Sequence, residues 1–161
     1  MPRERKTFSA NEVRASSLLK LWNEHLNSKE VAKSSQVIGH FNKYSNFCDK
    51  IANKLFDIDE DIKVYFTSKY ILFEKGDHQF LGIASQKNRL SLAPITLKPS
   101  DIKDMAVSSR NITGKTYSMG GDVRVYFEKC DNEDLFKANK IAEMSFNTSS
   151  ENMKKGYFAK K

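Results

Sequence analysis

The sequence predicts a single domain of the α+β class, in which a pair of N-terminal helices packs with an antiparallel β-meander, one further strand and a C-terminal helix. Apolar residues recur at helical spacing in the first third of the chain. Short runs rich in Ile, Val, Tyr and Phe, separated by turn residues, follow in the middle, and a last helical stripe comes near the end. Because helices and strands are grouped along the sequence instead of alternating, an antiparallel sheet is favoured over a parallel one.

Length and charge set the expected boundaries. The chain has 161 residues, which suits one domain, and a net charge of +7. The first six residues contribute +2 and the last eleven contribute +3, so much of the basic charge lies near the ends. We therefore expect a basic flexible N-terminus at 1–8, one domain at 9–146 with a helical part at 9–56 and a sheet and helix part at 62–146, and a disordered basic tail at 147–161.

The first helix is expected to begin after Ser9. Glu12 follows three residues later, which is the capping-box pairing, and Phe8 can pack on Val13 as a hydrophobic staple. Apolar residues then continue at helical spacing to about residue 26, where we expect this helix to end.

A short helix at 29–34 and a long helix at 36–56 are expected next. In the long helix, apolar residues step by four and three, so one face is continuously apolar. The stripe is shorter than three heptads, which favours a helix packed on its own core over a coiled coil. The stripe consists of Val37, Phe41, Tyr44, Cys48, Ile51 and Leu55.

Four strands and a short helix are expected from residue 62 onward. The β-rich runs lie at 62–66, 70–73, 79–85 and 89–93, and the turn residues between them indicate an antiparallel meander. A short helix then extends to about residue 107, with Ser100 as its N-cap.

The last third of the chain contains a loop, a strand and a helix. Residues 108–121 are polar, contain three glycines and have no periodicity, so we expect a mobile loop. The strand at 122–129 alternates, with Val123 on one face and Arg124 on the other. Asp131 is expected to cap a final helix at 132–146.

No catalytic fingerprint is present in the sequence. The histidines His25, His40 and His78 lie on different predicted elements without metal-ligand spacing, and no glycine-rich phosphate-binding motif occurs. We interpret Cys48 and Cys130 as buried free thiols. We therefore expect a protein without a cofactor or metal, and a non-enzymatic role is favoured over an enzymatic one.

An acidic cluster leaves one enzymatic alternative open. Asp57, Asp59, Glu60 and Asp61 lie together in the sequence, and Lys63 follows at the start of a predicted strand. Clustered carboxylates can bind Mg²⁺ for a metal-dependent nuclease, commonly with a lysine nearby. A solvated connection between helix and sheet is the simpler interpretation, and the nuclease stays as the weaker hypothesis.

Nucleic-acid binding is the leading hypothesis. Between residues 87 and 124 the chain carries seven basic and three acidic residues, and Tyr, Lys and Arg recur on the predicted outward faces of the strands. Cations contact phosphates and aromatic rings can stack on bases, and a preference for single strands would follow if the tyrosines stack in this way. The predicted residues, whether the target is DNA or RNA, are Lys63, Tyr65, Lys69, Tyr70, Lys87, Arg89, Arg110, Lys115, Tyr117, Arg124 and Tyr126.

A protein-interaction module, such as an inhibitor or adaptor, is the main alternative. It would pair the apolar face of the long helix with a second copy of the chain or with a protein partner. The interaction face consists of Val37, Phe41, Tyr44, Ile51 and Leu55.

A helix-turn-helix, which would bind DNA, is matched only weakly by residues 28–36, because the turn glycine is missing.

Localisation is predicted from two further features. No apolar run approaches the roughly 20 residues of a membrane span, and the first residues contain no apolar signal region. We therefore expect a cytoplasmic protein that does not contact membranes.

Overall fold

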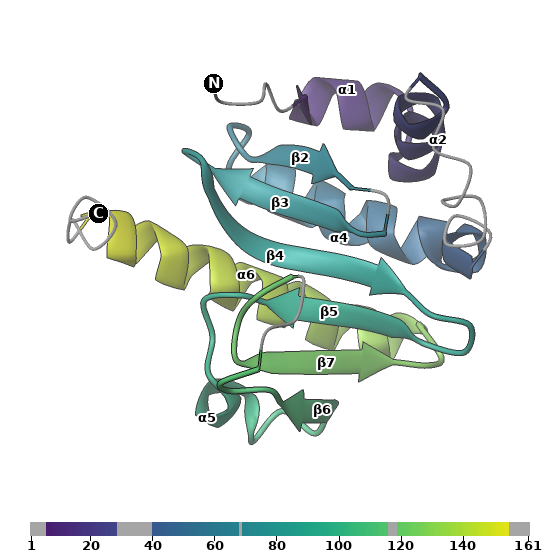
Figure 1. Ribbon diagram of the computed structural model, residues 1–161. Coiled ribbons are helices and arrows are strands. Elements are labelled where there is room, and N and C mark those ends of the chain that lie inside the picture. The colour runs from purple at the N-terminus through teal and green to yellow at the C-terminus, as the bar shows by residue number, and fades with distance from the viewer. Residues whose placement is uncertain (1–5, 29–39, 68, 116–118, 155–161) are drawn as a thin grey trace.

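The computed structural model describes residues 6–28, 40–67, 69–115 and 119–154 (Figure 1). Within these residues, helices pack against an antiparallel sheet of seven strands, which confirms the predicted α+β class. The strand order is β1-β2-β3-β4-β5-β7-β6. The strands are β1 (Thr7–Phe8), β2 (Lys63–Phe66), β3 (Ile71–Lys75), β4 (His78–Ser85), β5 (Leu90–Pro94), β6 (Ser108–Asn111) and β7 (Val123–Phe127). The helices are α1 (Ala10–Ala15), α2 (Leu18–Ser28), the 3₁₀ turn η2 (Asn42–Tyr44), α4 (Ser45–Ile58), α5 (Pro99–Ile102) and α6 (Asn132–Lys154).

The two faces of the sheet have different surroundings. Helices α4 and α6 lie behind one face in Figure 1, and the hydrophobic core lies between them and the sheet. Ile83 of β4 faces Leu92 of β5, which in turn faces Val125 of β7, and all three side chains are fully buried. We call the opposite face of the sheet, which is turned toward the viewer, the open face.

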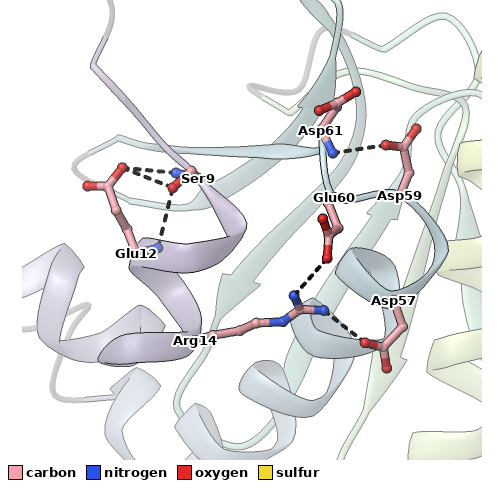
Figure 2. Close-up of polar contacts among 7 residues, drawn as sticks. All are labelled: Ser9, Glu12, Arg14, Asp57, Asp59, Glu60 and Asp61. Carbon is pink, nitrogen blue, oxygen red and sulfur yellow. Dashed lines mark hydrogen bonds and ion pairs between the residues drawn. The ribbon is translucent and has the colours of Figure 1, made fainter.

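The predicted capping box at the first helix is present (Figure 2). Ser9 Oγ accepts a hydrogen bond from the Glu12 N–H at 3.3 Å, and Glu12 Oε1 accepts one from the Ser9 N–H at 3.2 Å. Thr7 and Phe8, which were expected in a flexible segment, pair with β2 as strand β1. Phe8 packs on Phe66 with ring centroids 5.2 Å apart, and this apolar contact fixes the strand on the sheet.

The first helical region is divided into α1 and α2, so the prediction of one continuous helix is wrong. The Leu18 N–H donates to Asp49 Oδ1 at 3.0 Å, and the Lys20 N–H donates to Ser17 Oγ at 3.1 Å. These side chains satisfy the backbone donors of a second helix start, so the chain can turn after Ala15. The apolar stripe hides this break because it continues across both helices.

The long helix predicted at 36–56 is interrupted by η2 and then continues as α4 to Ile58. Its apolar stripe belongs to the core, since Phe41, Cys48, Ile51 and Leu55 are all fully buried. The predicted short helix at 29–34, the weak helix-turn-helix match and the residue at position 37 fall on residues outside the described part of the chain.

Two predictions between β5 and β7 are wrong. The N-cap of α5 is Lys98 instead of Ser100, because the Asp101 carboxylate accepts the Lys98 N–H at 2.7 Å and Pro99 takes the first helical position. Residues 108–111 form the edge strand β6, paired with β7, instead of belonging to a mobile loop. All four residues of β6 are exposed, so the strand has no apolar alternation for sequence reasoning to detect.

The last helix begins where the sequence predicts. Asp131 Oδ1 accepts the Asp134 N–H at 2.9 Å, which confirms Asp131 as the cap of α6. The helix then continues past residue 146 to Lys154, through residues that were expected in a disordered tail.

Small polar side chains extend the buried stripe of α6 toward its C-terminal end, with Ser145 inside the predicted helix and Ser149 beyond it. Ser145 and Ser149 are fully or almost fully buried. Ser145 Oγ donates to the Phe80 carbonyl at 2.5 Å, and Thr96 Oγ1 donates to the Ser145 carbonyl at 2.7 Å. These hydrogen bonds join α6 to β4 and to the segment that follows β5. A serine gives no hydropathy signal for such a buried contact.

Candidate functional site

The open face of the sheet is lined with small residues where β4 and β5 pair. Gly82 faces Ala93, and Ala84 faces Ser91. Tyr126 of β7 lies beside Ser91 on the same face, because the two residues are cross-strand partners. Met119 covers Gly82, whereas Ala84 and Ser91 line a hollow on this face.

A cavity of about 390 Å³ opens over this part of the open face. Four cationic and two aromatic side chains line it, and no carboxylate belongs to the described residues of its lining. We call it the cationic cavity. Its lining consists of Lys69 and Tyr70 from the β2–β3 turn, Ala84, Ser85, Gln86 and Arg89 around the β4–β5 turn, Ser91 of β5, Arg110 of β6, Met119, and Arg124 and Tyr126 of β7.

Two of the cations face each other across neighbouring strands. Arg110 of β6 and Arg124 of β7 are cross-strand partners, so their side chains leave the sheet on the same face. Arg110 is exposed, whereas Arg124 is only 5% exposed. Like charges directly opposite each other repel, and an anion placed between them would relieve that repulsion.

Arg124 also holds the connection between β6 and β7 in place. Its Nη1 donates to the Gly120 carbonyl at 2.7 Å. Met119, next to Gly120, lies on the open face so closely that a Cβ at Gly82 would come within 2.8 Å of the methionine sulfur. Arg124 therefore has a structural role in forming one wall of the cavity, besides its charge.

A third cation, Arg89, is held against an aromatic ring. Its guanidinium lies over the Tyr126 ring at 3.7 Å from the centroid, within the range of a cation–π contact. Its Nε also donates to Gln86 Oε1 at 2.5 Å. Both contacts fix the guanidinium at the cavity margin, so less conformational freedom is lost when it binds a ligand.

The cationic cavity gathers six of the eleven residues predicted to bind nucleic acid, namely Lys69, Tyr70, Arg89, Arg110, Arg124 and Tyr126. Lys63 and Tyr65 lie on β2, and the burial of Val64 and Phe66 between and beside them confirms the predicted alternation of that strand.

The other predicted residues lie elsewhere. Lys87 is exposed in the β4–β5 turn, where its carbonyl accepts a hydrogen bond from Lys43 Nζ. Lys115 is exposed in the turn after β6. Position 117 falls outside the described residues. Gln86, Ser91 and Met119 line the cavity without having been predicted, and the run of small residues on β4 and β5 was the available signal for a hollow.

The acidic cluster forms ion pairs at the connection between α4 and β2. Figure 2 shows Arg14 reaching Asp57 at 2.8 Å and Glu60 at 3.5 Å. Lys75 Nζ lies 2.9 Å from Asp59 and 3.4 Å from Asp61. We call residues 57–61 the acidic connector. In the described part of the chain, no group of three or more His, Cys, Asp and Glu side chains is placed to hold a metal ion.

The pKa of Asp59 reflects these contacts. Burial by itself would raise the pKa of this carboxyl, but the hydrogen bonds from Lys75 Nζ and the Asp61 N–H outweigh it, and the net pKa is lowered. The pKa of Lys75 is raised, chiefly by its hydrogen bond to Asp59. Both shifts favour the charged forms, so Asp59 and Lys75 form an ion pair in a connector whose four carboxylates contact two cations.

The apolar face proposed for protein interaction is covered by the chain itself. Phe41, Ile51 and Leu55 are fully buried and Tyr44 is 5% exposed. These side chains pack in the same core as α6 and the sheet. They present no apolar surface to a partner in the structure described.

Cys130 is placed near the start of α6 and is half-buried. Burial, followed by the nearby charges of Asp134 and Asp131, raises the pKa of its thiol to about 12. At neutral pH this thiol is protonated, so it is a poor nucleophile. Cys48 is fully buried, and burial also raises the pKa of its thiol.

Comparisons with protein-family models, with curated protein sequences and with solved structures found no match to this chain. Among the described residues, no helix combines the length and the apolar character that crossing a membrane requires.

Proposed function

We propose that this protein binds single-stranded nucleic acid through the cationic cavity. The observation that carries the proposal is the cross-strand pair of Arg110 and Arg124 inside a cavity whose described lining contains four cations and no carboxylate. Such a site favours an anion, and nucleic acid offers a regular series of phosphates.

The aromatic residues support a nucleic acid over a simple anion. Tyr70 and Tyr126 line the same cavity as the four cations, so one ligand can meet rings and charges together. Bases stack on aromatic rings and on guanidinium planes, and Arg89 over Tyr126 offers such a layered surface.

The size of the cavity supports a single strand. A volume of about 390 Å³ falls in the range of sites that take one small organic group at a time. A nucleotide from a flexible single strand can enter a hollow of this size. In a duplex the bases stay stacked inside the double helix, so a duplex presents mainly its phosphates.

Fluorescence anisotropy of labelled single-stranded and double-stranded DNA and RNA, at several salt concentrations, tests the proposal. We expect micromolar or tighter binding of single strands and a steep dependence of affinity on salt. Arg110→Ala is expected to weaken binding about tenfold and to lower the salt slope by about 0.7 for the lost phosphate contact. Lys140→Ala, at an exposed position on α6, removes the same charge outside the cavity and serves as the matched control.

Two results would contradict the proposal. One is that no nucleic acid binds even at low salt. The other is that Arg110→Ala and Lys140→Ala weaken binding equally, which would show that only the overall charge matters.

A further inference from the structure

A second cavity lies on the other side of the β4–β5 turn from the cationic cavity. Its volume is about 400 Å³. Gln86 and Arg89 of the turn line the cationic cavity, whereas Asn88 of the same turn lines the second one. The second cavity is lined by Lys43, Tyr44, Asn46, Phe47, Lys50, Asn88, Glu128, Lys129, Cys130, Asp131, Asn132 and Leu135.

Cations continue from one cavity to the other. Lys87 is exposed within the turn, and its carbonyl accepts a hydrogen bond from Lys43 Nζ, which fixes η2 beside the turn. Lys43, Lys50 and Lys129 then line the second cavity, and all three are exposed. In Figure 1 the β4–β5 turn and the link from β7 to α6 lie at the same end of the sheet.

The polar groups of the second cavity suit a nucleic-acid strand. Three asparagines, at positions 46, 88 and 132, offer donors and acceptors beside the three lysines. Its two carboxylates, those of Glu128 and Asp131, stand against the three lysines, so the lining keeps a net positive charge.

A third cavity at this end of the molecule has the opposite balance of charge. It is lined by four carboxylates, those of Glu128, Asp131, Glu133 and Asp134, against the two cations Lys129 and Lys137. The second and third cavities share Glu128, Lys129 and Asp131, so the lysines of η2 and α4 on one side and the carboxylates of α6 on the other make the difference. A polyanion leaving the cationic cavity is therefore favoured toward the start of α4.

We infer that a single strand held in the cationic cavity passes over the β4–β5 turn and continues into the second cavity. The inference rests on the proposed function, and it extends the binding site of the strand from the cationic cavity over the β4–β5 turn to the second cavity. Lys87, Lys43, Lys50 and Lys129 contact successive phosphates along this track, while the bases that stack are those near Tyr70 and Tyr126.

The length of the oligonucleotide distinguishes binding to the cationic cavity alone from binding to both cavities. Single strands of about 4 and about 12 nucleotides, which span the usual range of single-strand site sizes, are titrated against the full chain and against Lys50→Ala/Lys129→Ala. The control is Lys54→Ala/Lys140→Ala, which removes two exposed charges outside both cavities.

We expect the longer strand to bind the unmodified chain more tightly than the short one. The variant Lys50→Ala/Lys129→Ala is expected to weaken the longer strand about tenfold and to lower its salt slope by about 1.4, for two lost phosphate contacts, while leaving the short strand unchanged. Arg110→Ala is expected to weaken both strands.

Each alternative outcome overturns a defined statement. If the longer strand binds no more tightly than the short one, or if the two double variants behave alike, the track over the turn is wrong while the cationic cavity stands. If neither strand binds the unmodified chain, the proposed function itself fails. A circular dichroism melt of each variant confirms that the exposed substitutions leave the fold intact.

Discussion

The acidic connector and the cationic cavity both concentrate charge, but they do so in different ways. At the connector, Arg14 and Lys75 each contact two carboxylates, so every carboxylate of the cluster lies within 3.5 Å of a cation. In the cavity, cations from four segments meet, and two of them are direct cross-strand partners. Ion pairs stabilise a junction within the fold, whereas cations gathered around a hollow create a positive potential that favours an anionic ligand.

This comparison predicts opposite behaviour for two arginines. Removing Arg14 should affect stability and leave binding alone. Removing Arg110 should affect binding, and stability should stay equal or rise slightly because its repulsion with Arg124 is lost.

Arg110→Glu is expected to have the largest effect. It replaces a cation of the cavity with an anion, and like charges brought against a phosphate cost several kcal/mol, so affinity for a single strand should fall on the order of 100-fold at low salt. Anisotropy titration measures it, with Lys140→Glu as the control of equal charge change. Equal losses in the two variants would remove the distinction between the cavity and the rest of the surface.

Tyr126→Ala tests whether the cavity reads bases as well as phosphates. The Arg89 guanidinium lies over the Tyr126 ring, so a base stacks on this pair and the substitution removes the support of the guanidinium. Stacking of one base is worth about 1–3 kcal/mol, so affinity for single strands should fall about tenfold or more, with a smaller loss for duplex. Tyr126→Phe keeps the ring and should bind like the unmodified chain. A loss of equal size in Tyr126→Phe would mean that the hydroxyl, and not the ring face, makes the contact.

Arg14→Ala tests the ion pairs of the acidic connector. Its partners Asp57 and Glu60 are largely exposed, so the loss in the free energy of unfolding should stay below about 1 kcal/mol. Urea denaturation measures this loss, and single-strand affinity should remain within about twofold of the unmodified chain, as expected for an exposed charge outside the site. A large loss of affinity would show that the connector takes part in binding.

The pH dependence of stability gives the smallest effect. The pKa of Asp59 in the folded chain is lower than in the unfolded chain, since the hydrogen bonds from Lys75 and the Asp61 N–H exceed the opposing effect of burial. The ion pair therefore contributes fully above the ordinary Asp pKa of about 4, and its contribution is lost as the pH falls through the folded-state value. Lys75→Met should make stability less sensitive to pH in that acid range, and Lys140→Met should not. Identical acid profiles for the two variants would contradict the assigned pairing.

Local sequence signals predicted most of the fold. The capping box at Ser9, the alternation of β2 and the cap at Asp131 each depend on residues within a few positions of one another. The break before Leu18 was missed because Asp49, which accepts its N–H, lies 31 residues away in the sequence. The far end of α6 was missed because Ser149, which is buried beyond residue 146, is a small polar residue that gives no hydropathy signal.

The candidate site was predicted by residue type but not by arrangement. Tyr, Lys and Arg on outward positions were recognisable, and six of those residues line the cationic cavity. Their meeting depends on the strand order, in which β7 lies between β5 and β6 and so sets Arg110 opposite Arg124. That order is a property of the whole sheet, and nothing in the local sequence of β6, whose residues are all exposed, indicates it.

Photocrosslinking with a single strand that carries 5-iodouridine tests the central claim most directly, because it reports where the bases lie. Crosslinked peptides from the full chain are identified by mass spectrometry, with excess unlabelled strand as the competitor. We expect adducts on the peptides that contain Tyr70 or Tyr126, and their loss in Arg110→Glu. Adducts confined to other peptides, such as those of the acidic connector, would contradict the claim that nucleic acid binds in the cationic cavity.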